Sequence, residues 1–147
     1  MSDLPEAPPP GARSSTLRYR VPFYDTDGMR VVHHANFVRY LELARILFLD
    51  EHDVPYKQYV DLGLHFSVTR VELDYRRAAS FDDLLEVTCW AEAVGGASLR
   101  IGYVIRKDGE LIATAATGHA MVTDEGRPTR IPRDRRDHLR SLLQPQS

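Results

Sequence analysis

The densest group of chemically active side chains lies in residues 24–36, which read Tyr-Asp-Thr-Asp-Gly-Met-Arg-Val-Val-His-His-Ala-Asn. Two carboxylates, Asp25 and Asp27, precede two histidines, His33 and His34. Carboxylates and imidazoles serve as general bases, general acids or nucleophiles, and active sites are often placed on loops between regular elements. The same residue types also make ordinary turns, so the segment is both a candidate catalytic loop and a candidate structural loop.

Other kinds of site fit this segment poorly. An EF-hand calcium loop needs three oxygen-bearing positions before its glycine and a glutamate after it, whereas Gly28 directly follows Asp27 and the next acid is Glu42. Consecutive histidines point apart on regular backbone, so we expect no metal site. The glycine patterns that hold dinucleotides or nucleotide phosphates are absent, and we expect no cofactor.

The overall composition predicts a soluble globular protein. The 147-residue chain carries 19 basic and 21 acidic side chains, so its formal net charge of −2 gives no general attraction to nucleic acid or anionic membranes. The single cysteine, Cys89, suits a reducing compartment and lies on the apolar phase of an alternating segment, where thiols are usually inert. The chain shows neither a signal-peptide pattern nor an apolar stretch of about 18 residues, so we expect a cytoplasmic location without membrane insertion.

Residues 16–24 and 37–50 predict the two elements that flank the candidate loop. Apolar and polar side chains alternate in the first range, which predicts a half-buried strand whose buried phase includes Val21 and Phe23. The second range carries apolar side chains at helical spacing around much of its circumference, with Asn36 as a suitable N-cap. We therefore expect a strand, the loop, and a helix that is enclosed on several sides.

The rest of the chain changes to the two-residue period of strands. We predict strands at residues 64–76, 84–94, 98–107 and 110–123, arranged as a four-strand meander, and a short terminal helix at 132–143. Asp108-Gly109 predicts a tight type I′ hairpin turn between the last two strands. The last strand is rich in alanine, which suits close approach of the helix. This order predicts an α+β fold with a curved antiparallel sheet around a central helix.

The first 15 residues differ in composition from the rest of the chain. They hold four of the nine prolines and almost no large hydrophobic side chains, so they bury too little surface to offset the entropy cost of ordering. We predict a disordered tail over residues 1–15 and a single domain over residues 16–147.

Three short stretches resemble the signature of a known family. Asp-Thr-Asp ends at Asp27, Val-Val-His-His-Ala-Asn-Phe begins at Val31, and Tyr-Leu-Glu-Leu-Ala-Arg begins at Tyr40; Asp27 and His34 are seven residues apart. Over about residues 16–131 the chain resembles the 4-hydroxybenzoyl-CoA thioesterase family, including its Tol-Pal-associated members. The resemblance implies a hotdog fold and the hydrolysis of an acyl-coenzyme A to a free acid and coenzyme A.

The resemblance also implies roles for individual residues. Asp27 corresponds to the catalytic carboxylate, acting either as the nucleophile on the thioester carbonyl or as the base that activates water. The backbone N–H groups of Ala35 and Asn36, at the start of the helix, correspond to oxyanion donors, with His34 adding an imidazole contact. The further side chains expected near the substrate are those of Tyr24, His33 and Asn36.

Six arginines between residues 127 and 140 are the only concentrated positive charge. A solvated helix face is the ordinary interpretation of such a run. We predict instead that Arg127 and Arg130 help to hold the phosphates of the substrate, with an effect that falls as salt rises. A lone hotdog sheet has an open edge, so we also expect self-association as a homodimer or homotetramer.

Two departures from the family pattern leave parts of the site open. Met29-Arg30 follows the aspartate where many relatives carry a small residue or proline, and residues 95–97 replace basic residues of some relatives. The carrier of the acyl group is either coenzyme A or acyl carrier protein. The alternative functions are a hotdog dehydratase, whose histidine motif is absent, and a module that binds acyl-CoA without turnover, against which the retention of Asp27 argues.

Overall fold

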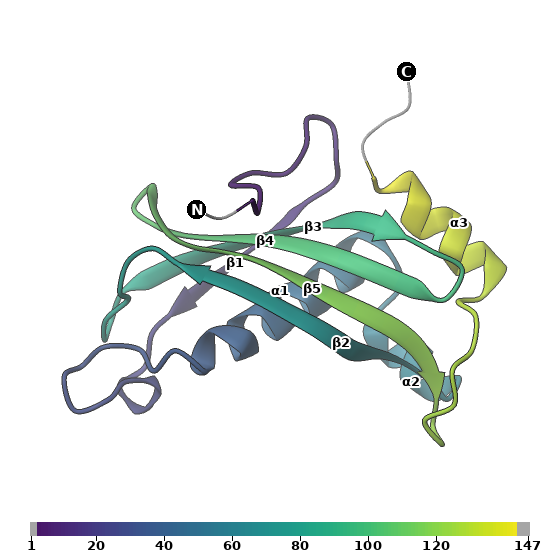
Figure 1. Cartoon of the computed structure of the whole chain (residues 1–147), viewed down its shortest axis with the longest axis horizontal. Helices are drawn as coiled ribbons and strands as arrows, with labels where there is room; N and C mark the ends of the chain where they lie inside the picture. Colours follow the sequence, from purple (N-terminus) through teal and green to yellow (C-terminus); the bar gives the residue numbers. More distant parts are fainter. Residues whose placement is uncertain (1–2, 144–147) are drawn as a thin grey trace.

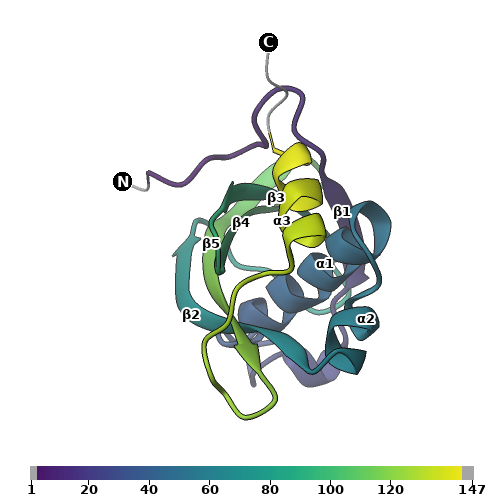
Figure 2. The same ribbon diagram turned by 90° about the vertical axis from the view of Figure 1, so that its right-hand side faces the viewer.

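The fold is a curved antiparallel sheet that surrounds one long helix. The computed structural model describes residues 3–143. Its five strands are β1 (Ser15–Arg20), β2 (Leu64–Tyr75), β3 (Leu84–Val94), β4 (Ser98–Lys107) and β5 (Glu110–Thr123), in the order β1-β3-β4-β5-β2. Its helices are α1 (Asn36–His52), α2 (Tyr56–Asp61) and α3 (Arg133–Ser141), with a 3-10 turn η1 (Phe23–Asp25). Figures 1 and 2 show α1 on the inner face of the sheet, which confirms the predicted α+β hotdog fold.

One broad apolar face holds α1 in this position, and the prediction that the helix is enclosed on several sides is wrong because Val38 and Leu43 are each 42% exposed. The buried side chains of α1 are Phe37, Tyr40, Leu41, Ala44, Phe48 and Leu49. They share one core with the inward-facing side chains of β3 and β4, such as Leu85 and Ile101. Each large apolar side chain that is fully buried stabilises the folded state by about 1.5–3 kcal/mol relative to leaving it exposed. The helical spacing predicted for residues 37–50 therefore marks the central helix correctly.

β1 is shorter than its alternating pattern predicts. It ends at Arg20 instead of continuing to residue 24, because Pro22 has no N–H for the ladder and the chain turns into η1. Phe23, which the alternation places on the buried phase, is 59% exposed. Its ring packs edge-on against Phe81, with the ring centroids 5.5 Å apart. The strand prediction is therefore wrong after Arg20.

Three of the four later strands form the expected meander, whereas β2 lies elsewhere. β3, β4 and β5 pair in sequence order, and the predicted turn between β4 and β5 has positive φ angles at Asp108 (50°) and Gly109 (80°). β2 pairs with β5 at the far edge of the sheet instead of with β3. The prediction of a four-strand meander is wrong, because α1 and α2 carry the chain across the inner face before β2 begins (Figure 1).

The position of α1 leaves a groove along β2. We expected α1 to approach the small residues of β5, but it lies closest to β1 and β3. Hydrogen bonds of Asp25 to Tyr19 on β1 and to Tyr40 on α1 account for this position. Among residues 3–143, β2 has a strand partner on one side only, and its inward side chains Val68 and Val71 are 49% and 42% exposed.

Residues 3–14 form no helix or strand and run along the outer side of the sheet (Figure 1). The N–H of Arg13 donates to the carbonyl of Leu142 at 3.1 Å, so the segment before β1 meets the end of α3. The start of β1 at Ser15 lies at the predicted domain boundary, and the disorder of residues 1–15 stays a prediction. Residues 144–147 of the predicted domain lie outside the described residues.

Candidate active site

Asp25 and Asp27 lie two residues apart in the candidate loop but have different environments. Asp25 is 2% exposed. Its carboxylate accepts hydrogen bonds from Tyr19 Oη at 2.9 Å and Tyr40 Oη at 2.8 Å, and it pairs with Arg39 Nη2 at 2.6 Å. Burial, together with the adjacent carboxylate, raises the pKa of Tyr40, so this phenol keeps its proton and donates. Asp25 therefore anchors the loop to β1 and α1.

Asp27, the predicted catalytic carboxylate, is exposed on a tight loop. Its Oδ1 accepts the N–H of Met29 at 2.8 Å and the N–H of Val31 at 3.3 Å. The loop closes where the N–H of Asp27 donates to the carbonyl of Val31 at 2.9 Å, with Arg30 in the left-handed region at φ 63°. The described residues give Oδ2 no hydrogen bond, so this oxygen is open to water or a substrate.

His33 and His34 follow this loop and stack on each other, with ring centroids 4.3 Å apart. Nδ1 of His33 accepts the N–H of Ala35 at 3.2 Å, which places the proton of a neutral His33 ring on Nε2. The carbonyl of His34 accepts the hydroxyl of Tyr75 at 2.8 Å, which ties the start of α1 to the end of β2. Both imidazoles are exposed and lie next to the loop of Asp27.

The N–H groups expected to bind an oxyanion already donate to His33, which lies just before α1. The N–H of Ala35 donates to the His33 ring, and the N–H of Asn36 donates to the His33 carbonyl at 2.9 Å. Asn36 is the first residue of α1 rather than its N-cap, and its side chain donates instead to the carbonyl of Asp25 at 2.8 Å. The Ala35 N–H is the group for which a substrate can compete, because its acceptor is an exposed ring that can turn away.

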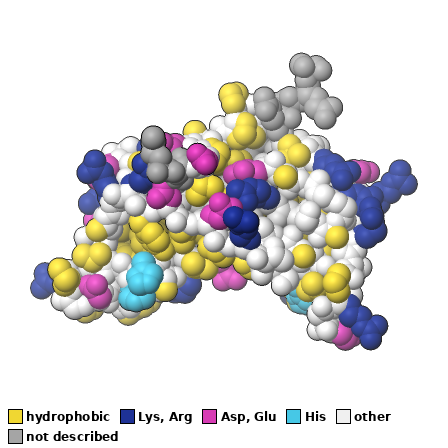
Figure 3. Space-filling view, in the orientation of Figure 1, with side chains coloured by type: hydrophobic (Ala, Val, Ile, Leu, Met, Phe, Trp, Pro, Cys, Tyr) yellow, Lys and Arg dark blue, Asp and Glu magenta, His cyan; other side chains and the backbone are white. Residues whose placement is uncertain are grey.

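A pocket of about 310 Å³ opens beside these histidines, between the start of α1 and the end of β2. It is lined by Val32, His34, Phe37, Tyr75, Arg76, Arg77, Ala78 and Ala79. The N–H of Val32 donates to the carbonyl of Ala79 at 2.8 Å, which holds the Asp27 loop at the rim. Figure 3 shows hydrophobic side chains around histidine at this end of the molecule. Tyr75 was not among the predicted site residues, although residues 75–79 resemble a later stretch of the family pattern.

Arg127 and Arg130 lie at the other end of β2 from His34. The carbonyl of Arg127 accepts the N–H of Thr123, which lies beside the start of β2. The 12-residue strand advances about 3.3 Å per residue, so the two regions are on the order of 35 Å apart. The guanidinium of Arg130 lies over Gly96, where a Cβ atom would come within 2.9 Å of Nη2. A single chain therefore does not bring these arginines to the candidate site.

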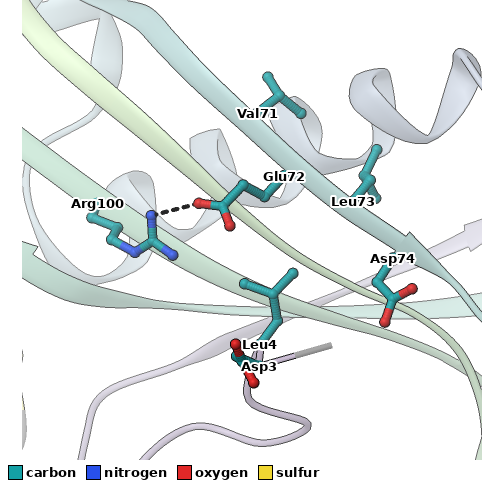
Figure 4. A pocket seen from close by; sticks show the side chains of 7 residues that line it. All are labelled: Asp3, Leu4, Val71, Glu72, Leu73, Asp74 and Arg100. Carbon is teal, nitrogen blue, oxygen red and sulfur yellow. Dashed lines mark hydrogen bonds and ion pairs between the residues drawn. The ribbon is translucent and has the colours of Figure 1, made fainter. Parts of the chain in front are cut away.

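Tyr24 and a larger hollow also lie away from this pocket. Tyr24, expected near the substrate, is 81% exposed and does not line the pocket. A hollow of about 640 Å³ on the outer side of β2 includes Asp3 and Arg100 (Figure 4). Arg100 there pairs with Glu72 at 3.0 Å and with Glu92 at 3.4 Å, so neighbouring carboxylates already balance its charge.

Comparisons with known proteins assign the chain to one family. Residues 21–141 match the family model described as "Thioesterase-like superfamily". A putative esterase of Aquifex aeolicus is 34% identical over 117 residues, which cover 80% of this chain and 91% of that protein. The acyl-CoA thioesterase YbgC of Haemophilus influenzae is 30% identical over 118 residues, 78% of this chain and 86% of that protein. The crystal structure of the hypothetical protein TT1821 from Thermus thermophilus matches this structure with a TM-score of 0.85 and 32% sequence identity. The match covers 90% of this chain and 100% of that protein's chain. The chain therefore belongs to the thioesterase-like superfamily.

Proposed function

We propose that the protein hydrolyses the thioester of an acyl-coenzyme A and releases a free acid and coenzyme A. The observation that carries the proposal is the open Asp27 carboxylate on a loop that leads directly into Val32 and His34, which line a pocket at the N-terminus of α1. Membership of the thioesterase-like superfamily and similarity to the acyl-CoA thioesterase YbgC support it. These similarities do not favour a dehydratase or a binding module without turnover.

Asp27 acts on the thioester by one of two routes. As a nucleophile, Oδ2 attacks the carbonyl carbon, the C–S bond breaks to release the thiolate of coenzyme A, and water then cleaves the mixed anhydride. As a general base, the carboxylate takes a proton from the water molecule that attacks the same carbon. Both routes place negative charge on the carbonyl oxygen. The Ala35 N–H and the helix dipole stabilise that charge once the His33 ring has turned away, and His34 adds its imidazole.

The finer placement of the protein is also a proposal. The signature between Asp27 and His34 supports a position near the 4-hydroxybenzoyl-CoA thioesterases and their Tol-Pal-associated members. Within residues 3–143, no helix combines the length and the apolar character that a membrane crossing requires. The single cysteine supports a cytoplasmic location.

Thiol release from a panel of acyl-coenzyme A substrates tests the proposed function. The panel contains short, long and aromatic acyl groups, with an acyl carrier protein thioester as the arm that distinguishes the two carriers. We expect at least one substrate to reach a kcat/KM of about 10⁴ M⁻¹s⁻¹, the lower end of the range for typical enzymes. Binding of acyl-CoA without thiol release from any member of the panel would support the binding module instead.

Self-association through β2 provides a way for the C-terminal arginines to reach the pocket. Two β2 edges that pair antiparallel place the start of one strand beside the end of the other. Arg127 and Arg130 of a second copy would then lie near the pocket of the first, where Arg76 and Arg77 already line the wall. The exposed inward side chains of β2 and its free edge support this arrangement. A homodimer is therefore the smallest proposed unit, and a homotetramer contains two.

Mixing two inactive variants tests this cross-subunit site. We expect Asp27→Asn and the double variant Arg127→Ala, Arg130→Ala each to have low kcat/KM at low salt. After subunit exchange, half of the dimers contain both variants, and each mixed dimer has one complete site. Mixing equal amounts should therefore restore about a quarter of wild-type activity. Failure to regain activity after verified exchange, or a monomer in light scattering, would contradict the arrangement.

A further inference from the structure

A second pocket, with a polar floor, lies between α1 and β2 farther along both elements than the thioester pocket. We propose that this second pocket selects acyl groups that carry an oxygen, as a carboxylate or hydroxyl, at the end remote from the thioester. The inference rests on the proposed thioesterase function and names the class of its acyl group.

The second pocket, of about 120 Å³, lies between the middle of α1 and the strands β2 and β5. Val38, Val68 and Val71 supply apolar lining. The polar lining comes from Arg45 and Thr117 and from two more exposed side chains, Arg39 and Glu42. Val38 lies one helical turn after His34 of the thioester pocket. Val71 lies on the same face of β2 as Tyr75 of that pocket. The two pockets are therefore neighbours between α1 and β2. An apolar chain with a polar end matches this order of surfaces.

Arg45 provides a guanidinium that is almost buried but weakly paired. Its side chain is 11% exposed, and its nearest carboxylate, on Glu42, is 3.9 Å away and largely in solvent. Within residues 3–143, its one hydrogen bond runs from Nη1 to Tyr103 Oη at 3.3 Å. Arg39 and Arg135, by contrast, each have a carboxylate at 2.6 Å. Because a buried charge without close partners is costly, Arg45 is suited to receive an oxygen from a ligand.

A chain of buried hydrogen bonds fixes the group against which Arg45 rests. Tyr103 Oη is 2.6 Å from Thr117 Oγ1, which is 2.7 Å from His119 Nε2. All three side chains are at most 2% exposed and occupy inward positions of β4 and β5. Burial and the nearby Arg45 lower the pKa of His119 to about 4, so the histidine is neutral at pH 7. Arg45 is therefore the buried positive charge of this pocket, whereas the half-exposed Arg39 is paired with Asp25.

The helix geometry sets the length of the acyl group. Arg45 is nine residues after the start of α1, a rise of about 13 Å, and its side chain leans back toward the N-terminus. The gap between a thioester carbonyl at that terminus and the guanidinium is thus on the order of 10 Å, about the length of an eight-carbon acyl chain.

Three substrates of equal chain length test this selectivity: suberoyl-CoA, 8-hydroxyoctanoyl-CoA and octanoyl-CoA, which end in a carboxylate, a hydroxyl and a methyl group. We expect kcat/KM for at least one oxygen-bearing substrate to exceed that for octanoyl-CoA about tenfold or more. A preference for suberoyl-CoA over 8-hydroxyoctanoyl-CoA would show that the charge of the carboxylate causes the selectivity. Equal kcat/KM for these two substrates would show that hydrogen bonding causes it. Octanoyl-CoA cleaved as well as both others would overturn the inference and leave the thioesterase function intact. No turnover on any acyl-CoA would contradict the function itself.

The Arg45→Met variant tests whether this side chain causes the preference. We expect the ratio of kcat/KM between the oxygen-bearing substrate and octanoyl-CoA to fall about tenfold. Arg133→Met, an exposed position on α3, is the matched control and should keep the ratio. An unchanged ratio in a folded Arg45→Met protein would overturn the inference. If that variant does not fold, Thr117→Val serves instead, because it keeps the shape of the side chain and removes the hydroxyl that holds Tyr103. The ratio must then fall about threefold. An unchanged ratio in Thr117→Val would also overturn the inference.

Discussion

Replacing Asp27 by asparagine is expected to lower kcat for acyl-CoA hydrolysis by about a thousandfold or more while leaving the fold intact. An asparagine Oδ1 can still accept the N–H groups of Met29 and Val31, so the loop keeps its hydrogen bonds. The substitution removes the negative charge needed for either route, whereas acyl-CoA binding uses other groups. The measurements are thiol release at saturating substrate, acyl-CoA binding and a circular dichroism melt.

Two further variants show whether the effect is specific to Asp27. Asp82→Asn removes a charge from another exposed loop near the same end of the molecule and is expected to keep near wild-type turnover. His34→Ala should lie between the two, because the proposed backbone donors survive loss of the imidazole. If Asp27→Asn retained more than about a tenth of wild-type turnover, the carboxylate would have no central role, since a general base or nucleophile contributes at least about a hundredfold.

The same substitution at Asp25 is expected to change stability instead of chemistry. Asp25 is buried and accepts from two tyrosines and one arginine, so Asp25→Asn removes a charge that Arg39 needs and turns an amide toward donors. We expect the free energy of unfolding to fall by about 2–4 kcal/mol. The loss is limited because Arg39 is half exposed and water can solvate its charge. The melting temperature should fall by roughly 5–15 °C.

Thermal melts of the two asparagine variants, side by side with wild type, measure this difference. At a temperature where the Asp25→Asn protein is folded, its turnover should fall less than about tenfold, because the reacting carboxylate of Asp27 remains. An Asp25→Asn protein that melts like wild type would show that the buried network does not hold the loop. Because Asp25 is buried, Asp25→Asn is not a neutral control for Asp27→Asn, although the two residues lie close together in the same loop.

The sequence predicted the elements whose apolar pattern is regular. α1 and the strands β3, β4 and β5 carry sustained periods, so their ranges agree closely with the structure. The order of strands was not predictable in the same way, because β2 carries no local signal that distinguishes pairing with β5 from pairing with β3. The early end of β1 had a signal in Pro22, but the regular alternation beyond it outweighed that signal in the prediction.

The candidate site was predictable where the family signature is local. The signature pointed to Asp27 and His34, and the structure has His34 just before α1 and Asp27 on the exposed loop that precedes it. The burial of Asp25 depends on tyrosines from two other elements, which no spacing within the loop reveals. Arg45 likewise has the helical spacing of an ion pair with Glu42, and only the packed structure shows it turned toward the sheet.

The release of coenzyme A and free acid from acyl-CoA, measured for purified wild type and for Asp27→Asn at the same concentration, shows whether the protein is a thioesterase that depends on Asp27. We expect wild type to produce the two products in equal amounts and at a rate about a thousandfold or more above that of Asp27→Asn. A wild-type protein that is folded and binds acyl-CoA, but releases coenzyme A no faster than Asp27→Asn across the whole panel, would contradict this expectation.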